Sequence, residues 1–216
     1  GRMDLDLSHP SISDLARTAR RRIPHFAWEY LDSGVGDERG RSHAEAALDG
    51  VRLMPHALRA VTEPDLSVEL LGRRHPLPFG FAPVGMSGLV WPGGEQILAR
   101  LAAREGLPYA LSTVAAATPE EVGPAADGQG WFQLYPPGQP EIRDDLCRRA
   151  REAGFHTLVL TADVPVASRR ERLRRARLSN PMRMTPRVVL DAARRPSWAL
   201  GQLSRGIPRL RTLEPY

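Results

Sequence analysis

The sequence contains no lysine, a single cysteine and no long apolar run. The lone Cys147 excludes an internal disulfide and is typical of a protein from a reducing compartment, so we expect a cytoplasmic protein. No stretch approaches the roughly 20 apolar residues of a membrane-spanning helix, and the first residues lack the charged-then-apolar pattern of a signal peptide. The six histidines are scattered without the spacing of metal ligands, which predicts no metal site.

Positive charge comes entirely from arginine, since the 30 basic residues include no lysine; they stand against 25 acidic residues. The excess of arginine is concentrated between Ser168 and Arg187. A nucleic-acid-binding surface would interleave such residues with aromatics or belong to a recognised module, and this segment does neither. We therefore expect no nucleic-acid partner and favour a solvated or membrane-facing segment.

Four short apolar runs alternate with stretches of helical pattern in the middle of the chain. They lie at residues 77–84, 107–113, 131–135 and 156–161. Strands that are apolar on both faces and separated by helices are typical of a parallel sheet. The helices carry capping signals, because Gly106 follows the first and Thr118 with Glu121 forms a capping box before the second.

The pattern divides the chain into three parts. Residues 1–75 predict a helical and extended N-terminal segment, with two short helices separated at Pro24. Residues 76–163 predict an α/β unit of four parallel strands. Residues 164–216 form a long basic connection without a strand pattern.

Small or polar residues follow each of the four predicted strands. In order they are Pro83-Val84-Gly85-Met86, Ser112-Thr113, Gln133 with Tyr135, and Thr161 with Asp163. Since the carboxyl ends of parallel strands meet at the edge where α/β barrels bind their ligands, we expect these residues to converge on one site. Serine, glutamine and threonine can hydrogen-bond a planar heteroaromatic ring, tyrosine can donate to a carboxylate, and aspartate can hold an imidazolium. The alternative is that each residue is a turn former, but four coincidences favour a site.

Five segments give the sequence a resemblance to a known family. They are "FAWEYLDSGVGDE", "GFAPVGMSGLVWPGGE", "ALSTVAAATPEEV", "WFQLY" and "LVLTADVPVASRRER". In this order and spacing they resemble the FMN-dependent α-hydroxy-acid dehydrogenases and oxidases, which act on lactate, mandelate or glycolate. The resemblance implies a (β/α)8 TIM barrel with FMN at its carboxyl end, of which this chain supplies the N-terminal segment and strands one to four. It also implies oxidation of an L-2-hydroxy acid to the 2-oxo acid.

The resemblance assigns roles to individual positions. The positions that match the cofactor site are Pro83, Val84, Gly85, Ser112, Gln133 and Thr161. Tyr30 and Tyr135 match the two substrate-side tyrosines, and Arg170 matches an arginine near the substrate carboxylate. Asp163 matches the carboxylate that steadies the catalytic histidine, so the implied catalytic residues of this chain are Asp163 and Tyr135.

Other parts of the family's active site have no counterpart in this sequence: the catalytic histidine, the carboxylate-binding arginine, the lysine beside the flavin and the phosphate site. We therefore expect a C-terminal half of the same enzyme, as a second chain or as further polypeptide, and expect Tyr216 to lie in the connection after strand four. The whole enzyme is expected to be a homo-oligomer. The alternative is a non-catalytic half-barrel that serves as a binding or interaction module, and the sheet edges such a half exposes make it the weaker hypothesis.

Residues 185–210, "TPRVVLDAARRPSWALGQLSRGIPRL", place apolar side chains among arginines. Such a segment suits the surface of an anionic bilayer, and the resemblance implies a membrane-binding segment here, as in relatives of the mandelate dehydrogenase type. It predicts peripheral contact with the inner face of the cell membrane. In the competing hypothesis the apolar residues cap the barrel and the arginines face water, with the helical spacing broken at Pro196.

Overall fold

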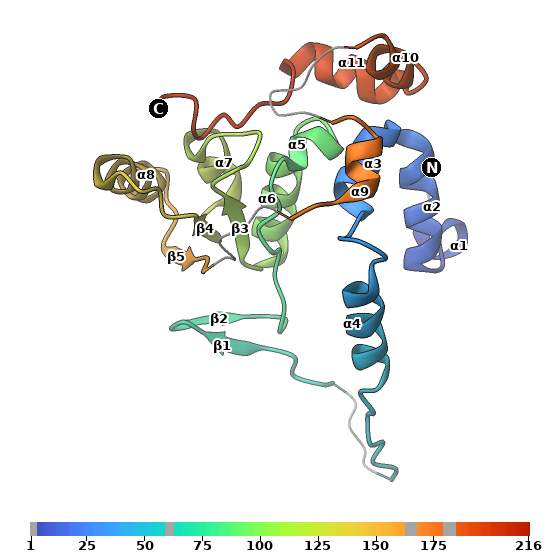
Figure 1. The fold of residues 1–216 in the computed structure, drawn as a ribbon. Helices are drawn as coiled ribbons and strands as arrows, with labels where there is room; N and C mark the ends of the chain where they lie inside the picture. The colour runs from blue at the N-terminus through green and yellow to red at the C-terminus, as the bar shows by residue number, and fades with distance from the viewer. Residues whose placement is uncertain (1–3, 59–62, 163–167, 179–184) are drawn as a thin grey trace.

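The computed structural model describes residues 4–58, 63–162, 168–178 and 185–216 (Figure 1). The N-terminal part holds four helices: α1 (Leu5–Ser8), α2 (Ile12–Arg22), α3 (His25–Asp32) and α4 (Arg39–Asp49). Pro24 is the N-cap of α3 and separates it from α2, as the sequence predicts. A two-stranded antiparallel hairpin follows, made of β1 (Val68–Leu70) and β2 (Arg73–His75).

The middle of the chain alternates helices and strands. Its elements are α5 (Ser87–Val90), α6 (Gly94–Glu105), β3 (Tyr109–Ser112), α7 (Pro119–Ala126), β4 (Gly130–Leu134), α8 (Pro140–Glu152) and β5 (Thr157–Leu160). Strands β3, β4 and β5 are parallel neighbours in chain order, with a crossover helix between each pair. The α/β class and the second, third and fourth predicted strands are thereby confirmed.

The first predicted strand, residues 77–84, is not a regular strand. Only Phe81 pairs with the sheet, through a parallel bridge to Tyr109 in which Phe81 N donates to Pro108 O at 2.8 Å and Ala110 N donates to Phe81 O at 2.9 Å. Pro78 and Pro83 have no N–H group and cannot extend the ladder. The segment therefore lies beside β3, where the first strand of a barrel would lie, but pairs with β3 at one residue only.

The helix ends follow the predicted capping chemistry. Gly106 ends α6 in the left-handed region, with a φ of 68°, where glycine carries no steric penalty. Thr118 Oγ1 accepts from Glu121 N at the start of α7, and the Glu121 carboxylate accepts from Thr118 N at 3.0 Å. Gly106 thus fixes where α6 ends ahead of β3, and Thr118 fixes where α7 begins after it.

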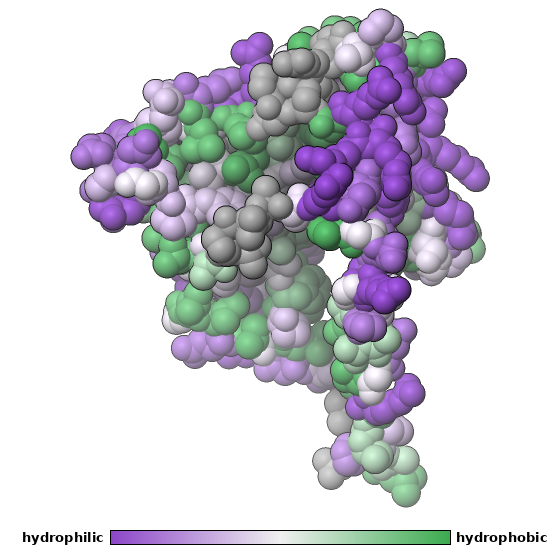
Figure 2. All heavy atoms as spheres, in the orientation of Figure 1, coloured by the Kyte–Doolittle hydropathy of each residue, from purple (hydrophilic) through white to green (hydrophobic). Residues whose placement is uncertain are grey.

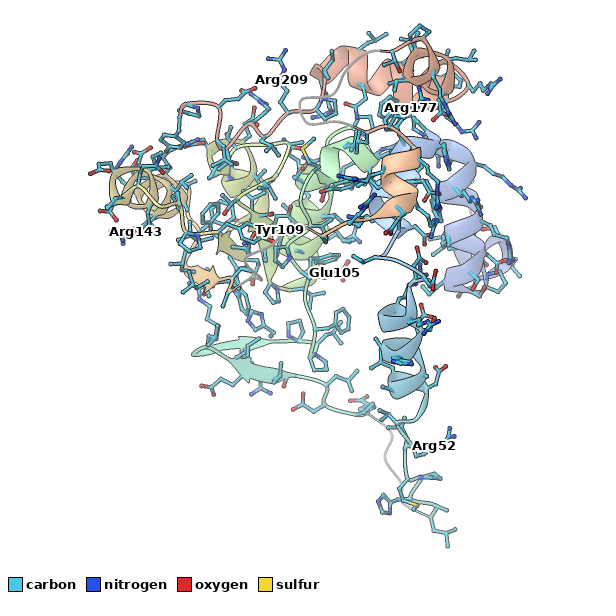
Figure 3. All side chains as sticks on the ribbon, viewed as in Figure 1. Arg52, Glu105, Tyr109, Arg143, Arg177 and Arg209 are labelled. Carbon is cyan, nitrogen blue, oxygen red and sulfur yellow. The ribbon has the colours of Figure 1, made fainter. Side chains whose placement is uncertain are left out.

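Helices α6, α7 and α8 cover one face of the sheet (Figure 1). The buried side chains that fill the space between the layers include Ala99, Ala102, Tyr109, Leu111, Val122, Phe132, Leu134, Leu146 and Phe155. Figure 3 places Tyr109 in the centre of the molecule, whereas the labelled Arg52, Arg143 and Arg177 lie at its periphery. Apolar burial of this kind contributes roughly 1.5–3 kcal/mol for each large side chain.

Strand β5 lacks such a cover. Leu158 and Leu160 pair in register with Phe132 and Leu134 and therefore point to the same outer face, yet they are 52% and 64% exposed. On the inner face, the hairpin β1–β2 and the sheet enclose an open hollow of about 370 Å³, lined by apolar side chains that include Leu70. Figure 2 shows hydrophobic residues gathered at lower left, over the hairpin and the adjoining sheet. Both faces next to β5 thus have unpartnered apolar surface.

Three helices occupy the described part of the basic connection: α9 (Glu171–Arg175), α10 (Pro186–Ala193) and α11 (Pro196–Arg205). Helix α9 packs on α3, and α10 pairs with α11. Pro196 is the first residue of α11, where its missing N–H costs no hydrogen bond. It therefore separates α10 from α11, which explains why the helical spacing of the apolar residues is broken there. Among the described residues no strand follows β5, in agreement with the sequence.

Candidate active site

A row of hydrogen-bonded side chains crosses the carboxyl ends of the three strands. Ser112 Oγ donates to Gln133 Oε1 at 2.9 Å, and Gln133 Nε2 donates to Thr161 Oγ1 at 2.9 Å. Ser112 and Gln133 are buried, and Thr161 is half-buried. In the sheet register Ser112 is opposite Gln133, and Gln133 is opposite Val159. Thr161 lies two residues after Val159, so Ser112, Gln133 and Thr161 all point to the inner face of the sheet. The structure therefore brings together three of the residues expected at this edge.

Thr113 extends this row toward Tyr135. Its Oγ1 donates to Gln133 O at 2.5 Å and accepts from Tyr135 N at 3.1 Å, so one buried hydroxyl fixes the backbone at the exit of β4. The Tyr135 side chain is 39% exposed beyond it. Thr113 was expected at this edge as one of the polar residues that end the second predicted strand, although the resemblance assigns it no role.

Residues 82–84 lie exposed beside the row, and Gly85 follows them at a close contact. Tyr30 Oη, from α3, donates to Gly85 O at 3.0 Å. A Cβ atom on Gly85 would lie 2.8 Å from Val114 Cγ2 and 3.1 Å from Tyr30 Oη, so only glycine fits between these two side chains. Met86 N donates to Val114 O at 3.0 Å and fastens this segment to the loop after β3.

Tyr30 is held as a neutral hydrogen-bond donor. Burial raises the pKa of the Tyr30 phenol; the Arg170 guanidinium works in the opposite direction, and the nearby Tyr135 and Glu95 add to the rise. Since an unperturbed tyrosine already titrates near pH 10, the phenol keeps its proton at neutral pH. Tyr30 can therefore donate to a carbonyl, as it does to Gly85, or to a ligand carboxylate.

Arg170 lies beside Tyr30, with its Cζ 5.6 Å from the centroid of the phenol ring. Its Nη2 donates to Glu29 O at 3.3 Å, to Ser33 Oγ at 3.1 Å and to Tyr30 O, so the guanidinium caps the carboxyl end of α3. The described contacts of Arg170 are with α3, and its role toward a substrate carboxylate stays a prediction.

A second arginine of this segment forms an ion cluster that the sequence reasoning missed. The Arg172 guanidinium contacts Glu29 at 2.8 Å, Asp32 at 2.8 Å and Glu38 at 2.9 Å. The Glu29 side chain is only 6% exposed, so its charge depends on this partner. The cluster anchors α9 to α3 and thereby fixes the helix that carries Tyr30.

Pro83, Val84 and Asp163 are the remaining residues expected at the site. Asp163 lies outside the described residues. Pro83 and Val84 are exposed at the open edge of the site. Cys147 is half-buried on α8 and packs against the main core. Among the residues that the structure describes, no group of three or more histidine, cysteine or acidic side chains has the arrangement of a metal site.

The open edge fits a planar ring with polar groups along one side. Residues 82–84 offer an exposed apolar surface, and the Ser112–Gln133–Thr161 row offers hydroxyl and amide groups beside it. These are the groups with which proteins bind heteroaromatic cofactors such as flavins, so the residues present fit FMN.

Comparison with known proteins gives one family for the chain. Residues 19–213 match the family described as FMN-dependent dehydrogenase. The chain is 36% identical over 200 residues to (S)-mandelate dehydrogenase of Pseudomonas putida. This alignment covers 93% of the present chain and 51% of the relative. The chain is 40% identical over 189 residues to a putative L-lactate dehydrogenase of Mycobacterium tuberculosis, covering 87% and 46%.

Solved structures agree with this grouping. The crystal structure of the monotopic membrane protein (S)-mandelate dehydrogenase superposes with a TM-score of 0.85 at 36% identity, covering 92% of this chain and 53% of that one. Mandelate oxidase superposes with a TM-score of 0.72 at 35% identity, covering 82% and 50%. The chain thus spans about half the length of the relatives it matches, with the parallel strands of a partial TIM barrel, and it belongs to the FMN-dependent dehydrogenase family.

Proposed function

We propose that this chain is the N-terminal half of an enzyme that uses FMN to oxidise an L-2-hydroxy acid to the 2-oxo acid. The observation that carries the proposal is the Ser112–Gln133–Thr161 row, which lies beside the exposed residues 82–84 at the carboxyl edge of the sheet. Support comes from the FMN dependence of the family and from relatives described as mandelate and lactate dehydrogenases.

Six residues would hold the cofactor. Pro83, Val84 and Gly85 would lie against the flavin ring, and Ser112, Gln133 and Thr161 would hydrogen-bond its polar atoms. Bound FMN supplies the redox chemistry, accepting two electrons from the substrate. The contribution of the protein is then to orient the ring and to keep the hydrogen-bond donors in fixed positions.

The substrate would lie on the side of the two tyrosines. Tyr30, protonated at neutral pH, and Tyr135, half-exposed at the end of β4, would donate to the carboxylate or hydroxyl of the acid. Arg170 adds positive charge beside Tyr30 and would attract the carboxylate. By the resemblance, the Asp163 carboxylate would stabilise the positive charge of the catalytic histidine. The second half of the enzyme would supply that histidine.

The unpartnered apolar surface supports a second half. Leu158 and Leu160 lie exposed on the outer face of β5, and the apolar hollow of about 370 Å³ opens on the inner face. In a closed barrel both surfaces would be covered by the next strand and helix. We infer that the remaining strands complete the barrel here, bringing the histidine, arginine and lysine to the site.

Helices α10 and α11 are proposed to rest on an anionic membrane surface. Val188 and Trp198 are buried against α3 and α5, whereas Leu200 is 66% and Leu203 80% exposed. Apolar side chains thus both cap the protein and face outward, so each of the two sequence hypotheses describes part of the segment. Arginines at positions 187, 194, 195, 205 and 209 flank the exposed apolar groups, as suits anionic headgroups.

Two structural matches support this membrane contact. The structure described as a monotopic membrane protein matches 92% of this chain, whereas that of a soluble mutant of the membrane-associated (S)-mandelate dehydrogenase matches 80%. No helix in the described parts of the chain is long and apolar enough to span a bilayer. Contact of the peripheral kind, through an amphipathic surface, is the mode that this architecture favours.

The enzymatic proposal is tested on the complete protein that contains this chain. We expect it to carry bound FMN and to convert (S)-mandelate or L-lactate to the 2-oxo acid in the presence of an artificial electron acceptor. Isolated residues 1–216 should show no turnover. Stoichiometric FMN binding and hydroxy-acid oxidation by residues 1–216 alone would refute the half-enzyme proposal, and a complete protein without flavin would favour the binding-module alternative.

The membrane proposal is tested by cosedimentation with anionic vesicles at low and high salt. The complete protein should pellet with vesicles at low salt, and Leu200→Glu combined with Leu203→Glu should abolish pelleting because it places charge on the apolar surface. Leu48→Glu, at an exposed leucine of α4, is the matched control. The proposal is wrong if the wild-type protein stays in the supernatant at low salt.

A further inference from the structure

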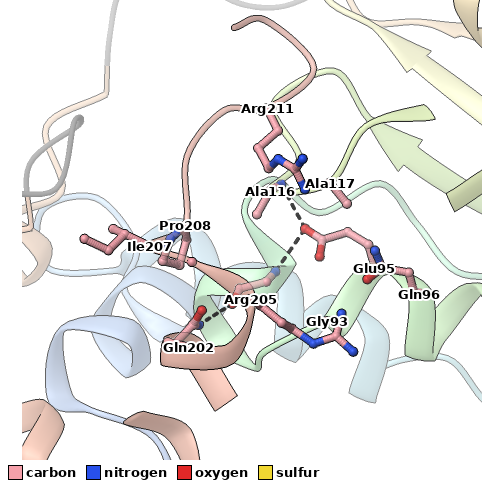
Figure 4. A pocket seen from close by; sticks show the side chains of 12 residues that line it. Gly93, Glu95, Gln96, Ala116, Ala117, Gln202, Arg205, Ile207, Pro208 and Arg211 are labelled. Atoms are coloured by element: carbon pink, nitrogen blue, oxygen red, sulfur yellow. Dashed lines mark hydrogen bonds between the residues drawn. The ribbon is translucent and has the colours of Figure 1, made fainter. Parts of the chain in front are cut away.

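The peptide of Gly88, in α5, is held from two sides by buried side chains of other elements. Gly88 N donates to Glu95 Oε1 at 2.9 Å, and Gln202 Nε2, from α11, donates to Gly88 O at 2.6 Å (Figure 4). Glu95 is 1% and Gln202 8% exposed. A buried carboxylate and a buried amide are costly unless they are fully hydrogen-bonded, so this arrangement is specific.

Glu95 also connects two loops of the candidate site. The oxygen that accepts from Gly88 accepts from Ala116 N at 3.0 Å, which ties the loop after the first barrel position to the loop after β3. The first of these loops carries residues 83–85, and the second follows directly after Ser112, the last residue of β3. Glu95 thus accepts one backbone N–H from each of the two loops through the same oxygen.

The loops approach each other so closely at this contact that only glycine fits at position 88. A Cβ atom on Gly88 would lie 2.9 Å from Ala116 Cβ and 3.0 Å from Glu95 Oε2. The adjoining cavity, lined by Glu95, Gln202 and Arg205, measures about 50 Å³. It has room for a few water molecules and for no organic ligand, so the side chains here serve to position the backbone.

The held peptide is three to five residues from the segment beside the cofactor position. Ser87 Oγ donates to Val84 O at 3.1 Å, and Met86 N donates to Val114 O at 3.0 Å, so the turn between Val84 and Gly88 is braced internally. Trp198 Nε1, also from α11, donates to Leu89 O at 2.9 Å. A shift of Gly88 would therefore move residues 83–85.

We propose that Glu95 and Gln202 are positioning residues that fix the backbone of residues 83–85 against β3, so that it meets the flavin in one orientation. This inference rests on the proposed FMN-dependent function. Neither side chain touches the candidate substrate or cofactor position, and each acts through the Gly88 peptide. Gln202 and Trp198 both belong to α11, so the helix that we propose to rest on the membrane is joined to the flavin-side segment by two buried hydrogen bonds, one to Gly88 O and one to Leu89 O.

The test uses variants of the complete enzyme. In Glu95→Ala both backbone N–H groups lose their acceptor, and we expect the FMN dissociation constant to rise about tenfold or more, with kcat reduced and the visible circular dichroism of the bound flavin altered. In Glu95→Gln an acceptor oxygen remains, so the FMN dissociation constant should stay within about threefold of the wild-type value. Gln202→Ala should raise the FMN dissociation constant severalfold while vesicle binding is unchanged.

Matched controls and the contrary results separate positioning from general stability. Glu105→Gln, at the exposed end of α6, and Ser204→Ala, exposed on α11, should leave FMN affinity, kcat and the flavin spectrum unchanged. The inference is overturned if Glu95→Ala or Gln202→Ala lowers only the melting temperature and leaves flavin affinity and spectrum as in the wild type. If the Glu95→Ala variant does not fold, the FMN dissociation constant and flavin spectrum of Gln202→Ala test the inference instead. If the wild-type protein binds no FMN, the proposed function and this inference both fail. If the wild type binds FMN and the Glu95→Ala and Gln202→Ala variants match it in FMN affinity and flavin spectrum, only the inference fails.

Discussion

Two polar networks on either side of Tyr30 differ in kind. The row Ser112–Gln133–Thr161 is built from neutral hydroxyl and amide groups. The cluster around Arg172 is built from one guanidinium and three carboxylates. Both span elements that are far apart in the sequence, but their chemistry suits them to different tasks.

The difference lies in how much hydrogen-bonding capacity each network has left. The guanidinium of Arg172 is surrounded by carboxylates, so its donors are used within the protein. The amide nitrogen of Gln133 has two N–H groups and the two hydroxyls have further lone pairs, so the neutral row keeps capacity for a ligand. The ionic cluster thus holds α3 and α9 together, while the neutral row is the surface that we propose to meet the cofactor.

The largest expected effect is on the ionic cluster. Arg172→Ala would leave the buried Glu29 carboxylate without its partner, and breaking a buried ion pair costs about 3 kcal/mol or more. We expect the free energy of unfolding of the complete protein, measured by urea titration, to fall by about this amount. Arg174→Ala, at an exposed arginine two positions further along α9, should change it by less than about 0.5 kcal/mol. Equal stability of the two variants would contradict the structural role of the cluster.

The second prediction concerns the neutral row. Gln133→Leu removes the acceptor of Ser112 and the donor to Thr161, which leaves buried hydroxyls unpaired at about 1–3 kcal/mol. We expect FMN affinity, measured by quenching of flavin fluorescence, to weaken at least tenfold. Gln139→Leu, at an exposed glutamine before α8, is the control and should bind FMN normally. Unchanged affinity in Gln133→Leu would remove the row from the cofactor site.

Tyr30 lies between the two networks and tests whether they act separately. Tyr30→Phe removes the hydrogen bond to Gly85 O, and we expect KM for the hydroxy acid to rise severalfold, a loss of about 1 kcal/mol. Stability should change little, because Arg170 and Arg172 still hold α3. Tyr216→Phe removes a surface phenol that contacts Asp145 and should leave KM unchanged. The same KM in both variants would argue against a substrate role for Tyr30.

The smallest expected effect comes from an ion pair at the surface. The Arg149 guanidinium holds the pKa of the Glu120 carboxyl down at about 2, below its ordinary value of 4.5. A depressed folded-state pKa stabilises the fold above pH 4.5, and this contribution is lost as the pH falls from 4.5 toward 2. Glu120→Gln should therefore slightly flatten the decline of the melting temperature over that range. A decline identical to that of the wild type would show that the pair contributes nothing measurable.

The neutral row was predictable from the sequence because it follows a rule of topology. Once residues 107–113, 131–135 and 156–161 are recognised as parallel strands, Ser112, Gln133 and Thr161 must emerge at one edge. The first strand was predicted too strongly, since Pro78 and Pro83 leave Phe81 as its only rung. The apolar pattern of residues 77–84 predicted a strand, but that pattern does not show that Pro78 and Pro83 have no N–H group to donate to a neighbouring strand.

The ionic cluster could not be predicted in the same way. Glu29 and Arg172 are 143 residues apart, and a run of arginines gives no sign of which one will be buried. Tyr30 was reached only through the resemblance, because its partner Gly85 is 55 residues away and "FAWEYLDSG" alone reads as a core aromatic. Long-range contacts between irregular segments depend on the whole fold.

The central claim is that this half-barrel carries the flavin-facing surface of a hydroxy-acid-oxidising enzyme. The most direct test is the visible spectrum of the complete protein under anaerobic conditions, before and after addition of (S)-mandelate or L-lactate. The account predicts an oxidised flavin spectrum that is bleached by one of these acids in the wild type, and a weakened or flavin-free spectrum in Gln133→Leu. A protein that binds no flavin, or whose flavin is unaffected by any L-2-hydroxy acid, would contradict it.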